Sequence, residues 1–236
     1  MFRQNGIPLY LQLKEYLLKS IETEYRPGDR LPSEGEIERQ YGVSRITVRK
    51  AIEELAREGI VSKKQGKGTF IREPKVLYDA NTIGSLTQRL AQENRQLNTR
   101  SIEYILLTDE HHVKDMLGCD RLLLIKRYRV LDGKPFAIMH NYICADRVPQ
   151  IESRFAIESL YTFYQETYGI VFAKAEEIVE ARAATREQAR VLEIEENAPL
   201  LSLQRLSFGP DGEAIEFSDI LIKANMYKHK IHLSAR

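Results

Sequence analysis

Residues 44–52 constrain the fold of this chain most, because they predict a helix with two different faces. Four apolar residues have the i, i+3, i+4, i+7 spacing of a stripe that packs on a core: Val48, Ala51, Ile52 and Leu55. Arg45 and Arg49 lie one turn apart on another face, and no acidic residue follows them until Glu53. Such a basic face either binds an anionic polymer or is simply solvated.

The residues before this stretch predict a shorter helix that a tight turn joins to it. Ser33-x-x-Glu36 is a capping-box signature. Gly42 suits the left-handed residue that closes a helix, and Ser44 can cap the next helix through its hydroxyl. Two helices joined in this way form a helix-turn-helix, whose second helix lies in the major groove of DNA.

A basic hairpin is predicted directly after the second helix. Residues 60–64 and 69–72 have the composition of short strands, and the glycine-rich turn 65–68 joins them. Its tip carries lysines and no bulky side chain, so it can approach a DNA groove closely. The order of helix, helix-turn-helix and basic hairpin predicts a DNA-binding domain over residues 1–73.

Charge is unevenly distributed along the chain. Residues 1–73 carry 14 Lys/Arg and 11 Asp/Glu, a net charge of +3, whereas the remainder carries 21 and 23, a net charge of −2. Within residues 43–72 there are eight basic and three acidic residues. A local surplus in a nearly neutral protein indicates a patch that binds a polyanion.

Composition excludes several classes of protein. No apolar run approaches the roughly 18 residues that span a bilayer, and no signal peptide is recognisable. The two cysteines, Cys119 and Cys144, form neither a disulfide framework nor a C-x-x-C motif. No nucleophile–base pair, metal-ligand cluster or phosphate-binding glycine loop is recognisable either. We therefore expect a cytoplasmic protein with no membrane contact, no catalytic residues, no metal site and no cofactor.

The second part of the chain contains a pattern that recurs. Residues 74–85 break the helical and strand patterns and are expected to form a linker before a second domain at 86–236. An order of strand, helix and two strands joined by Asp-Gly occurs twice, with the turns at Asp132-Gly133 and Asp211-Gly212. This looks like an internal duplication, which predicts an antiparallel sheet with helices on one side and a pocket where the halves meet.

Residues 7–72 resemble the winged-helix domain of the GntR family of bacterial transcription regulators. The matching motifs are Leu31-Pro32-Ser33-Glu34, Gly42-Val43-Ser44-Arg45-x-Thr47-Val48-Arg49, Leu55-x-x-Glu58-Gly59 and Gly66-x-Gly68-Thr69-Phe70. The resemblance implies major-groove contacts by the arginines, phosphate contacts by the hydroxyls and a wing tip in the minor groove. The expected DNA-binding residues are Ser33, Ser44, Arg45, Thr47, Arg49, Lys64, Gly66 and Lys67. One departure is Gly35, because the family usually has arginine there.

Residues 80–232 resemble the UTRA effector-binding domain of the HutC subfamily, which has a chorismate-lyase-like fold. The matching motifs are Leu117-Gly118, Ile125-x-Arg127-x-Arg129, Asp132-Gly133-x-Pro135, Ser159-Leu160-Tyr161, Ala183-Ala184-x-x-Glu187 and Pro199-Leu200-Leu201. The resemblance implies that, in members that respond to sugar phosphates, paired arginines and hydroxyls hold the phosphate. It also implies that a glutamate binds ligand hydroxyls. By position, the expected effector-binding residues are Ser85, Thr87, Arg127, Arg129, Ser159 and Glu216.

The residues themselves give independent support for an anion site. Arg127 and Arg129 are two apart on a predicted strand, so both side chains lie on one face, where burial is costly unless they are paired or bind an anion. The alternatives are a solvated face or pairing of Arg127 with Glu180 or Glu216. Arg205, at the equivalent position of the second repeat, is expected to be structural.

The two parts together predict an α+β protein, with a winged helix-turn-helix followed by an antiparallel-sheet UTRA domain. The expected function is a ligand-responsive repressor that binds two-fold double-stranded operator DNA as a homodimer. A small phosphorylated metabolite such as a sugar phosphate is expected to release it. Three alternatives remain open: sensing of a non-phosphorylated metabolite, an enzyme of chorismate-lyase-like fold fused to a DNA-binding arm, and a non-regulatory architectural DNA-binding protein.

Overall fold

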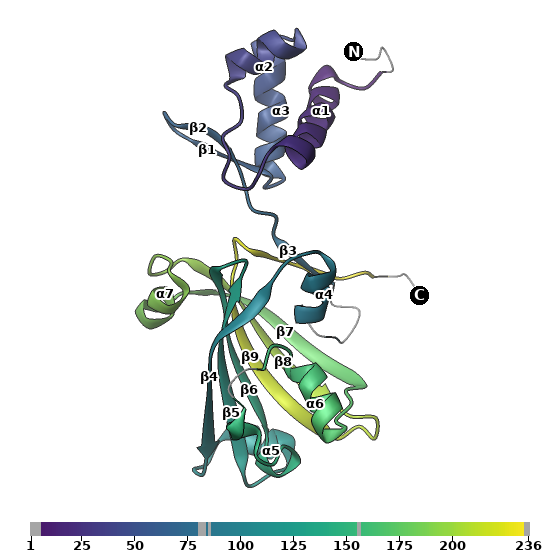
Figure 1. Ribbon diagram of the computed structural model, residues 1–236, viewed down its shortest axis with the longest axis vertical. Coiled ribbons are helices and arrows are strands. Elements are labelled where there is room, and N and C mark those ends of the chain that lie inside the picture. The colour runs from purple at the N-terminus through teal and green to yellow at the C-terminus, as the bar shows by residue number, and fades with distance from the viewer. Residues whose placement is uncertain (1–5, 80–83, 85, 155–156, 234–236) are drawn as a thin grey trace. The chain divides into compact units, whose positions relative to one another are not determined.

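The computed structural model divides into two compact units, with the boundary between Pro74 and Lys75 (Figure 1). The structure describes residues 6–79, 84, 86–154 and 157–233. None of the helices in these ranges combines the length and apolar character needed to cross a membrane.

The first unit consists of three helices and a hairpin: α1 (Leu9–Glu24), α2 (Glu34–Tyr41), α3 (Arg45–Arg57), β1 (Val61–Lys64) and β2 (Gly68–Ile71). The local signals read from the sequence are confirmed. Ser33 and Glu36 form a capping box at the start of α2, and Gly42 ends that helix with φ 64°. The Ser44 hydroxyl accepts a hydrogen bond from the Thr47 amide and so caps α3. The antiparallel hairpin β1–β2 is the predicted wing.

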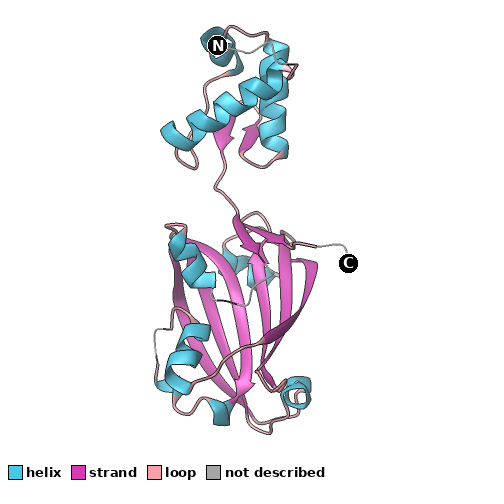
Figure 2. Cartoon of the chain, turned by 90° about the vertical axis from the view of Figure 1, so that its right-hand side faces the viewer, coloured by secondary structure: helices cyan, strands magenta, loops and turns pink. Residues whose placement is uncertain are grey.

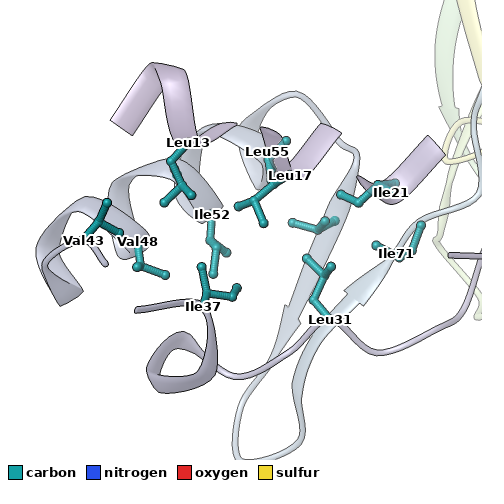
Figure 3. Close-up of a cluster of buried hydrophobic side chains, with 12 residues drawn as sticks. Leu13, Leu17, Ile21, Leu31, Ile37, Val43, Val48, Ile52, Leu55 and Ile71 are labelled. Carbon is teal, nitrogen blue, oxygen red and sulfur yellow. The ribbon is translucent and has the colours of Figure 1, made fainter. Parts of the chain in front are cut away.

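The core of this unit confirms the apolar stripe of α3. Val48, Ala51, Ile52 and Leu55 are fully buried and form one cluster with residues of α1, α2 and β2. Figure 3 shows side chains from α1, such as Leu13, pointing toward this stripe. Burial of one face of α3 leaves its other face free for a ligand.

The second unit is built on a six-stranded antiparallel sheet, with strand order β4-β5-β6-β9-β8-β7 (Figure 2). Its strands are β4 (Leu97–Leu107), β5 (Leu122–Leu131), β6 (Lys134–Cys144), β7 (Lys174–Ala183), β8 (Pro199–Phe208) and β9 (Ala214–Lys223). Its helices are α4 (Leu86–Gln92), α5 (His112–Leu117), α6 (Leu160–Tyr168) and α7 (Arg186–Leu192). The expected hairpin at Asp132-Gly133 is present, and both residues have positive φ.

The recurring sequence pattern corresponds to a recurring order of elements. Strand β4, helix α5 and the hairpin β5–β6 are followed, after α6, by β7, α7 and the hairpin β8–β9. The halves meet where β6 pairs with β9, with Asn141 opposite Ser218.

The expectation of helices on one side of the sheet is wrong. Alternate residues of β6 point to opposite faces, and both faces are covered. Ile138 packs with Ala189 of α7, whereas Ile143 packs with Leu160 of α6.

A second, small sheet lies inside the stretch expected to be a linker. Strand β3 (Val76–Asp79) pairs in parallel with β10 (Tyr227–Lys230) near the C-terminus. Val76 and Tyr78 are buried in the same cluster as Tyr227, which explains why this short segment is ordered as a strand. A pairing across about 150 residues leaves no local signal in the sequence.

Candidate nucleic-acid interface and effector pocket

The start of α3 presents the basic residues predicted to read DNA. Arg45, the first residue of the helix, has a side chain 72% exposed, and Arg49 is exposed one turn later. The Nε atom of Arg45 lies 3.7 Å from a carboxylate oxygen of Glu34. Glu34 thus holds an arginine in position, the role that its place beside the DNA-facing residues suggests. An exposed, partly oriented guanidinium is suited to base edges or phosphates.

One residue of this face was missed by the sequence analysis. Ile46 has 70% of its surface exposed, although it belongs to a helix with a well-formed core stripe. It lies between Arg45 and Thr47 in the first turn of α3, the part of a recognition helix that contacts base edges. An isoleucine outside the apolar stripe of an otherwise polar face was the signal available.

A groove of about 1020 Å³, counting the space at its mouth, separates the start of α2, the start of α3 and the wing. It brings together four of the expected DNA-binding residues: Ser33, Arg45, Lys64 and Gly66. The other four lie outside its lining: Ser44, Thr47, Arg49 and Lys67. Arg30 also lines the groove and was not predicted. The groove is therefore predominantly basic, with Glu34 as the one acidic residue of its described lining.

Two glycines of this groove differ in whether a larger side chain would fit in their place. Gly68 has φ 111°, and a Cβ there would lie 2.7 Å from Nε of Arg30, so this position excludes larger residues. Gly35 has no atom within 4 Å of the place a Cβ would occupy. The groove has open space at the position where the resemblance places an arginine.

The second unit contains a pocket of about 640 Å³, counting its mouth, on the face of the sheet that carries Arg127. The pocket brings together the expected residues Thr87, Arg127, Arg129, Ser159 and Glu216. Ser85 lies outside the described residues. Strands β5, β6, β8 and β9 all contribute to the lining, so the pocket lies where the two halves meet.

Arg127 and Glu216 are the two buried groups of the pocket whose bonding capacity is least used. Arg127 donates from Nη2 to Oδ1 of Asn141 at 3.2 Å, while its Nε and Nη1 atoms have no partner among the described residues. Neither carboxylate oxygen of Glu216 accepts a hydrogen bond of good geometry within those residues, although Asn141 and Tyr164 lie close enough to lower its pKa. Burial raises the pKa of Glu216 to about 7, although the charge of Arg127 opposes the shift. Buried groups of this kind are suited to a polar ligand.

Arg129, in contrast, uses all three of its guanidinium nitrogens in hydrogen bonds to the protein. Its Nε donates to the Asn98 carbonyl at 3.2 Å, and Nη1 donates to the Glu158 carbonyl at 2.8 Å. Its Nη2 donates to the Leu97 carbonyl at 2.9 Å and to the hydroxyl of Thr87 at 3.1 Å. Burial, followed by the charge of Arg127, lowers the pKa of Arg129 to about 9. The side chain joins β4, α4 and the segment before α6.

The expected hydroxyl residues also have roles within the fold. Thr87 donates to the Glu158 carbonyl at 3.0 Å, in addition to accepting from Arg129. The hydroxyl of Ser159 caps α6 by accepting from the Thr162 amide at 3.2 Å.

Several residues of the pocket were not among those predicted. Arg205, expected to be structural, bonds through Nε to Glu177 at 2.7 Å and through Nη2 to the hydroxyl of Tyr78. Tyr161 is partly buried and stacks on Phe172, with ring centroids 4.3 Å apart, and burial raises its pKa. The other polar or aromatic additions are Tyr78, Asn141, Glu158, Ser218 and Tyr227. Only the tertiary structure brings these residues together as neighbours.

Comparison with known proteins identifies both units. Residues 9–71 match the bacterial regulatory proteins of the gntR family, and residues 92–228 match the UTRA domain. The HTH-type transcriptional repressor NagR of Bacillus subtilis is 30% identical over 229 residues, which cover 95% of this chain and 94% of that protein. The chain belongs to the GntR family.

Other relatives of this GntR-family regulator agree. The mannosyl-D-glycerate transport/metabolism system repressor MngR of Escherichia coli is 27% identical over 225 residues, covering 94% of each chain. The crystal structure of PhnF from Mycobacterium smegmatis has the same fold, with a TM-score of 0.76 at 24% identity over 95% of this chain and all of that one. The protein is thus a transcriptional regulator of the repressor type and not an enzyme, and the predicted fold class is confirmed.

Proposed function

We propose that this protein represses transcription by binding a two-fold operator as a homodimer, and that a small phosphorylated metabolite such as a sugar phosphate releases it. The observation that carries the effector assignment is Arg127, a buried guanidinium whose Nε and Nη1 have no partner among the described residues. A phosphate or carboxylate accepts hydrogen bonds from such a guanidinium. Glu216, in the same pocket, accepts from sugar hydroxyls.

The assignment of individual roles follows from how each side chain is engaged. Arg127 binds the anion, whereas Arg129, with its four hydrogen bonds to the protein, holds the walls of the pocket in place. The apolar part of the lining, which includes Met139 and Leu203, packs against the carbon skeleton of the ligand. The name of MngR, which refers to mannosyl-D-glycerate, supports a sugar-derived effector.

The DNA-binding half of the proposal is tested by a gel shift on the DNA upstream of the protein's own coding sequence. Arg49→Ala removes an exposed guanidinium from α3 and should reduce affinity roughly 5- to 150-fold, by the roughly 1–3 kcal/mol of a good base or phosphate contact. Arg57→Ala is the matched control, because Arg57 is on the same helix but pairs with Glu54. Equal binding by Arg49→Ala and the wild type would refute the recognition-helix assignment.

The effector half is tested by thermal shift with glucose 6-phosphate and fructose 6-phosphate, each compared with its parent sugar and with inorganic phosphate. A ligand at about 100 times its Kd adds roughly 2.7 kcal/mol to the free energy of unfolding. Stabilisation by a phosphosugar, with release of operator DNA at the same concentration, supports the proposal. Stabilisation by uncharged sugars alone would favour a non-phosphorylated effector.

A further inference from the structure

The segment before α2 is hydrogen-bonded to β2 of the wing, and Arg30 lies within it. The Ile71 amide donates to the Asp29 carbonyl, and the Leu31 amide donates to the Thr69 carbonyl, each at 2.8 Å. These two bonds lie on either side of Arg30 along the chain. Because the backbone is held on both sides, the position of Arg30 on the wing is fixed before any ligand binds.

The side chain of Arg30 lies against Gly68, the first residue of β2. A Cβ at position 68 would lie 2.7 Å from Nε of Arg30 and 3.3 Å from its Cζ, so the guanidinium occupies space that only a glycine leaves free. Gly68 directly follows the turn at the tip of the wing. The guanidinium of Arg30 therefore lies beside the tip, where Arg30 lines the basic groove and is exposed.

The other basic residues that line this groove already have partners. One carboxylate oxygen of Glu34 lies 3.7 Å from Nε of Arg45, and the other lies 4.0 Å from Nζ of Lys63. The ammonium of Lys64 lies 5.0 Å from the centre of the Phe70 ring, which attracts a cation through its face.

Arg30 has no partner of either kind among the described residues. The carboxylate nearest to it in effect, that of Glu36, is engaged by Ser33. Its Oε2 accepts from the Ser33 amide and from the Ser33 hydroxyl, both at 2.7 Å. These hydrogen bonds lower the pKa of Glu36 most, and the charge of Arg30 lowers it least. Arg30 thus keeps its guanidinium donors available for an anion, which a planar guanidinium can bind through two nitrogens.

A duplex bound to this unit brings phosphates to the side of the wing. Arg45, at the start of the recognition helix, and Gly66, at the wing tip, line the same groove of the protein as Arg30. The narrow tip suits the interior of a DNA groove. A side chain beside the tip instead meets the sugar-phosphate strand that borders that DNA groove, where the acceptors are phosphate oxygens rather than base edges.

We propose that Arg30 binds a backbone phosphate of DNA beside the wing. The contact holds the wing against the duplex, and it supplies an arginine to a groove in which Gly35 replaces the usual one. A phosphate contact carries no base preference, so it adds affinity at any DNA sequence. The inference goes beyond the proposed function, because it requires DNA binding but neither the homodimer nor the phosphorylated effector.

The salt dependence of DNA binding by the full-length protein tests this contact. Arg30→Gln removes the charge and should lower the slope of log K against log salt concentration by about 0.9 for each copy bound. Raising the salt from 50 to 200 mM should then cost the variant about 3.5-fold less affinity per copy than it costs the wild type. Arg30→Lys keeps the charge and should keep the slope. Arg26→Gln, the matched control, removes an exposed charge of the same loop outside the groove and should also keep the slope.

Two duplexes separate this contact from the operator assignment. Fluorescence anisotropy measures the slopes on DNA upstream of the coding sequence and on an unrelated duplex, and Arg30→Gln should lower both equally. A wild type without preference for the upstream DNA would contradict the operator assignment, while the unrelated duplex still tests Arg30. An unchanged slope for Arg30→Gln on both duplexes would overturn the phosphate contact, even with weaker binding, because lost affinity at constant slope reports a change in the wing itself.

Methylphosphonate substitution in the upstream duplex locates the phosphate. A neutral methylphosphonate weakens binding wherever it replaces a phosphate that a charged side chain contacts. At one position of each bound site it should weaken the wild type and Arg26→Gln but not Arg30→Gln, which has already lost that contact. A scan in which every position affects Arg30→Gln as strongly as the wild type would also overturn the proposal.

Discussion

Arg127 and Arg205 hold equivalent positions in the two halves of the sheet, yet only Arg205 has a carboxylate opposite it. The register places Glu177 on β7 opposite Arg205, and Ile102 on β4 opposite Arg127. Arg205 is therefore neutralised by an ion pair, whereas Arg127 is buried beside an apolar neighbour. The duplicated architecture thus supplies one structural arginine, Arg205, and one, Arg127, whose guanidinium lines the pocket with two nitrogens that have no partner among the described residues.

Replacement of Arg127 by methionine should weaken effector binding without affecting operator binding. The variant removes the charge and keeps most of the side-chain volume. Loss of a charge-assisted hydrogen bond of about 1.5–3 kcal/mol corresponds to a roughly 10- to 100-fold higher Kd. Calorimetry with the phosphosugar that stabilises the wild type most measures the loss, and a gel shift measures operator binding. Arg129→Met is the contrasting variant, which should instead lower the free energy of unfolding by roughly 2–4 kcal/mol, since it leaves carbonyls without donors.

Glu216→Gln should change how stability depends on pH. Burial raises the pKa of Glu216 to about 7 in the folded protein, from an ordinary value of 4.5. Below pH 4.5 the carboxyl is protonated in both states. As pH rises from there to about 7, only the unfolded state ionises, so the wild type loses roughly 3 kcal/mol of stability relative to Glu216→Gln. Urea unfolding at several pH values measures the difference, and parallel pH profiles for the two proteins would contradict the assignment.

Ile46→Ala should reduce discrimination for thymine at one operator position. An exposed isoleucine in the first turn of α3 can contact a thymine methyl group. Replacing that thymine by deoxyuracil removes the methyl and should weaken wild-type binding roughly 4-fold, by about 0.8 kcal/mol. The alanine variant should be insensitive to the same replacement. Scanning each thymine of the bound site by fluorescence anisotropy checks both, and a wild type insensitive at every thymine would exclude the contact.

Gly35→Arg should strengthen DNA binding. The position is open, and it lies in the basic groove beside Arg45. An added phosphate contact steepens the dependence of log K on log salt concentration by about 0.9. Anisotropy titrations from low to moderate salt measure this slope, and Gly35→Ala provides a control that removes the glycine without adding charge. An unchanged slope in the arginine variant would mean that the side chain does not reach the DNA backbone.

The features predicted correctly are those that depend on neighbouring residues. The capping box of Ser33, the left-handed Gly42 and the Asp132-Gly133 turn follow from backbone preferences of a few adjacent residues. The apolar stripe of α3 follows from helical periodicity in the same way. Together these signals predicted the winged helix-turn-helix and the duplicated sheet.

The pairing of β3 with β10, and the helices on both faces of the sheet, were not predictable in this way. Neither short strand has a distinctive pattern, and their contact joins distant parts of the chain. Which face a helix covers depends on how its connections cross the sheet, and the two possible faces have similar alternating patterns.

The sequence by itself determined the helix-turn-helix and wing of this protein and the set of charged residues available to its pocket, because periodicity, caps and turns are encoded locally. Only the tertiary structure decided what each charge does. Strand register places a carboxylate opposite Arg205 and an apolar residue opposite Arg127. Arg129 donates hydrogen bonds to backbone carbonyls because β4 and the segment before α6 pack around it. Packing between distant segments sets the hydrogen-bond partners of a buried charge. Packing therefore gave the three chemically identical arginine side chains different roles.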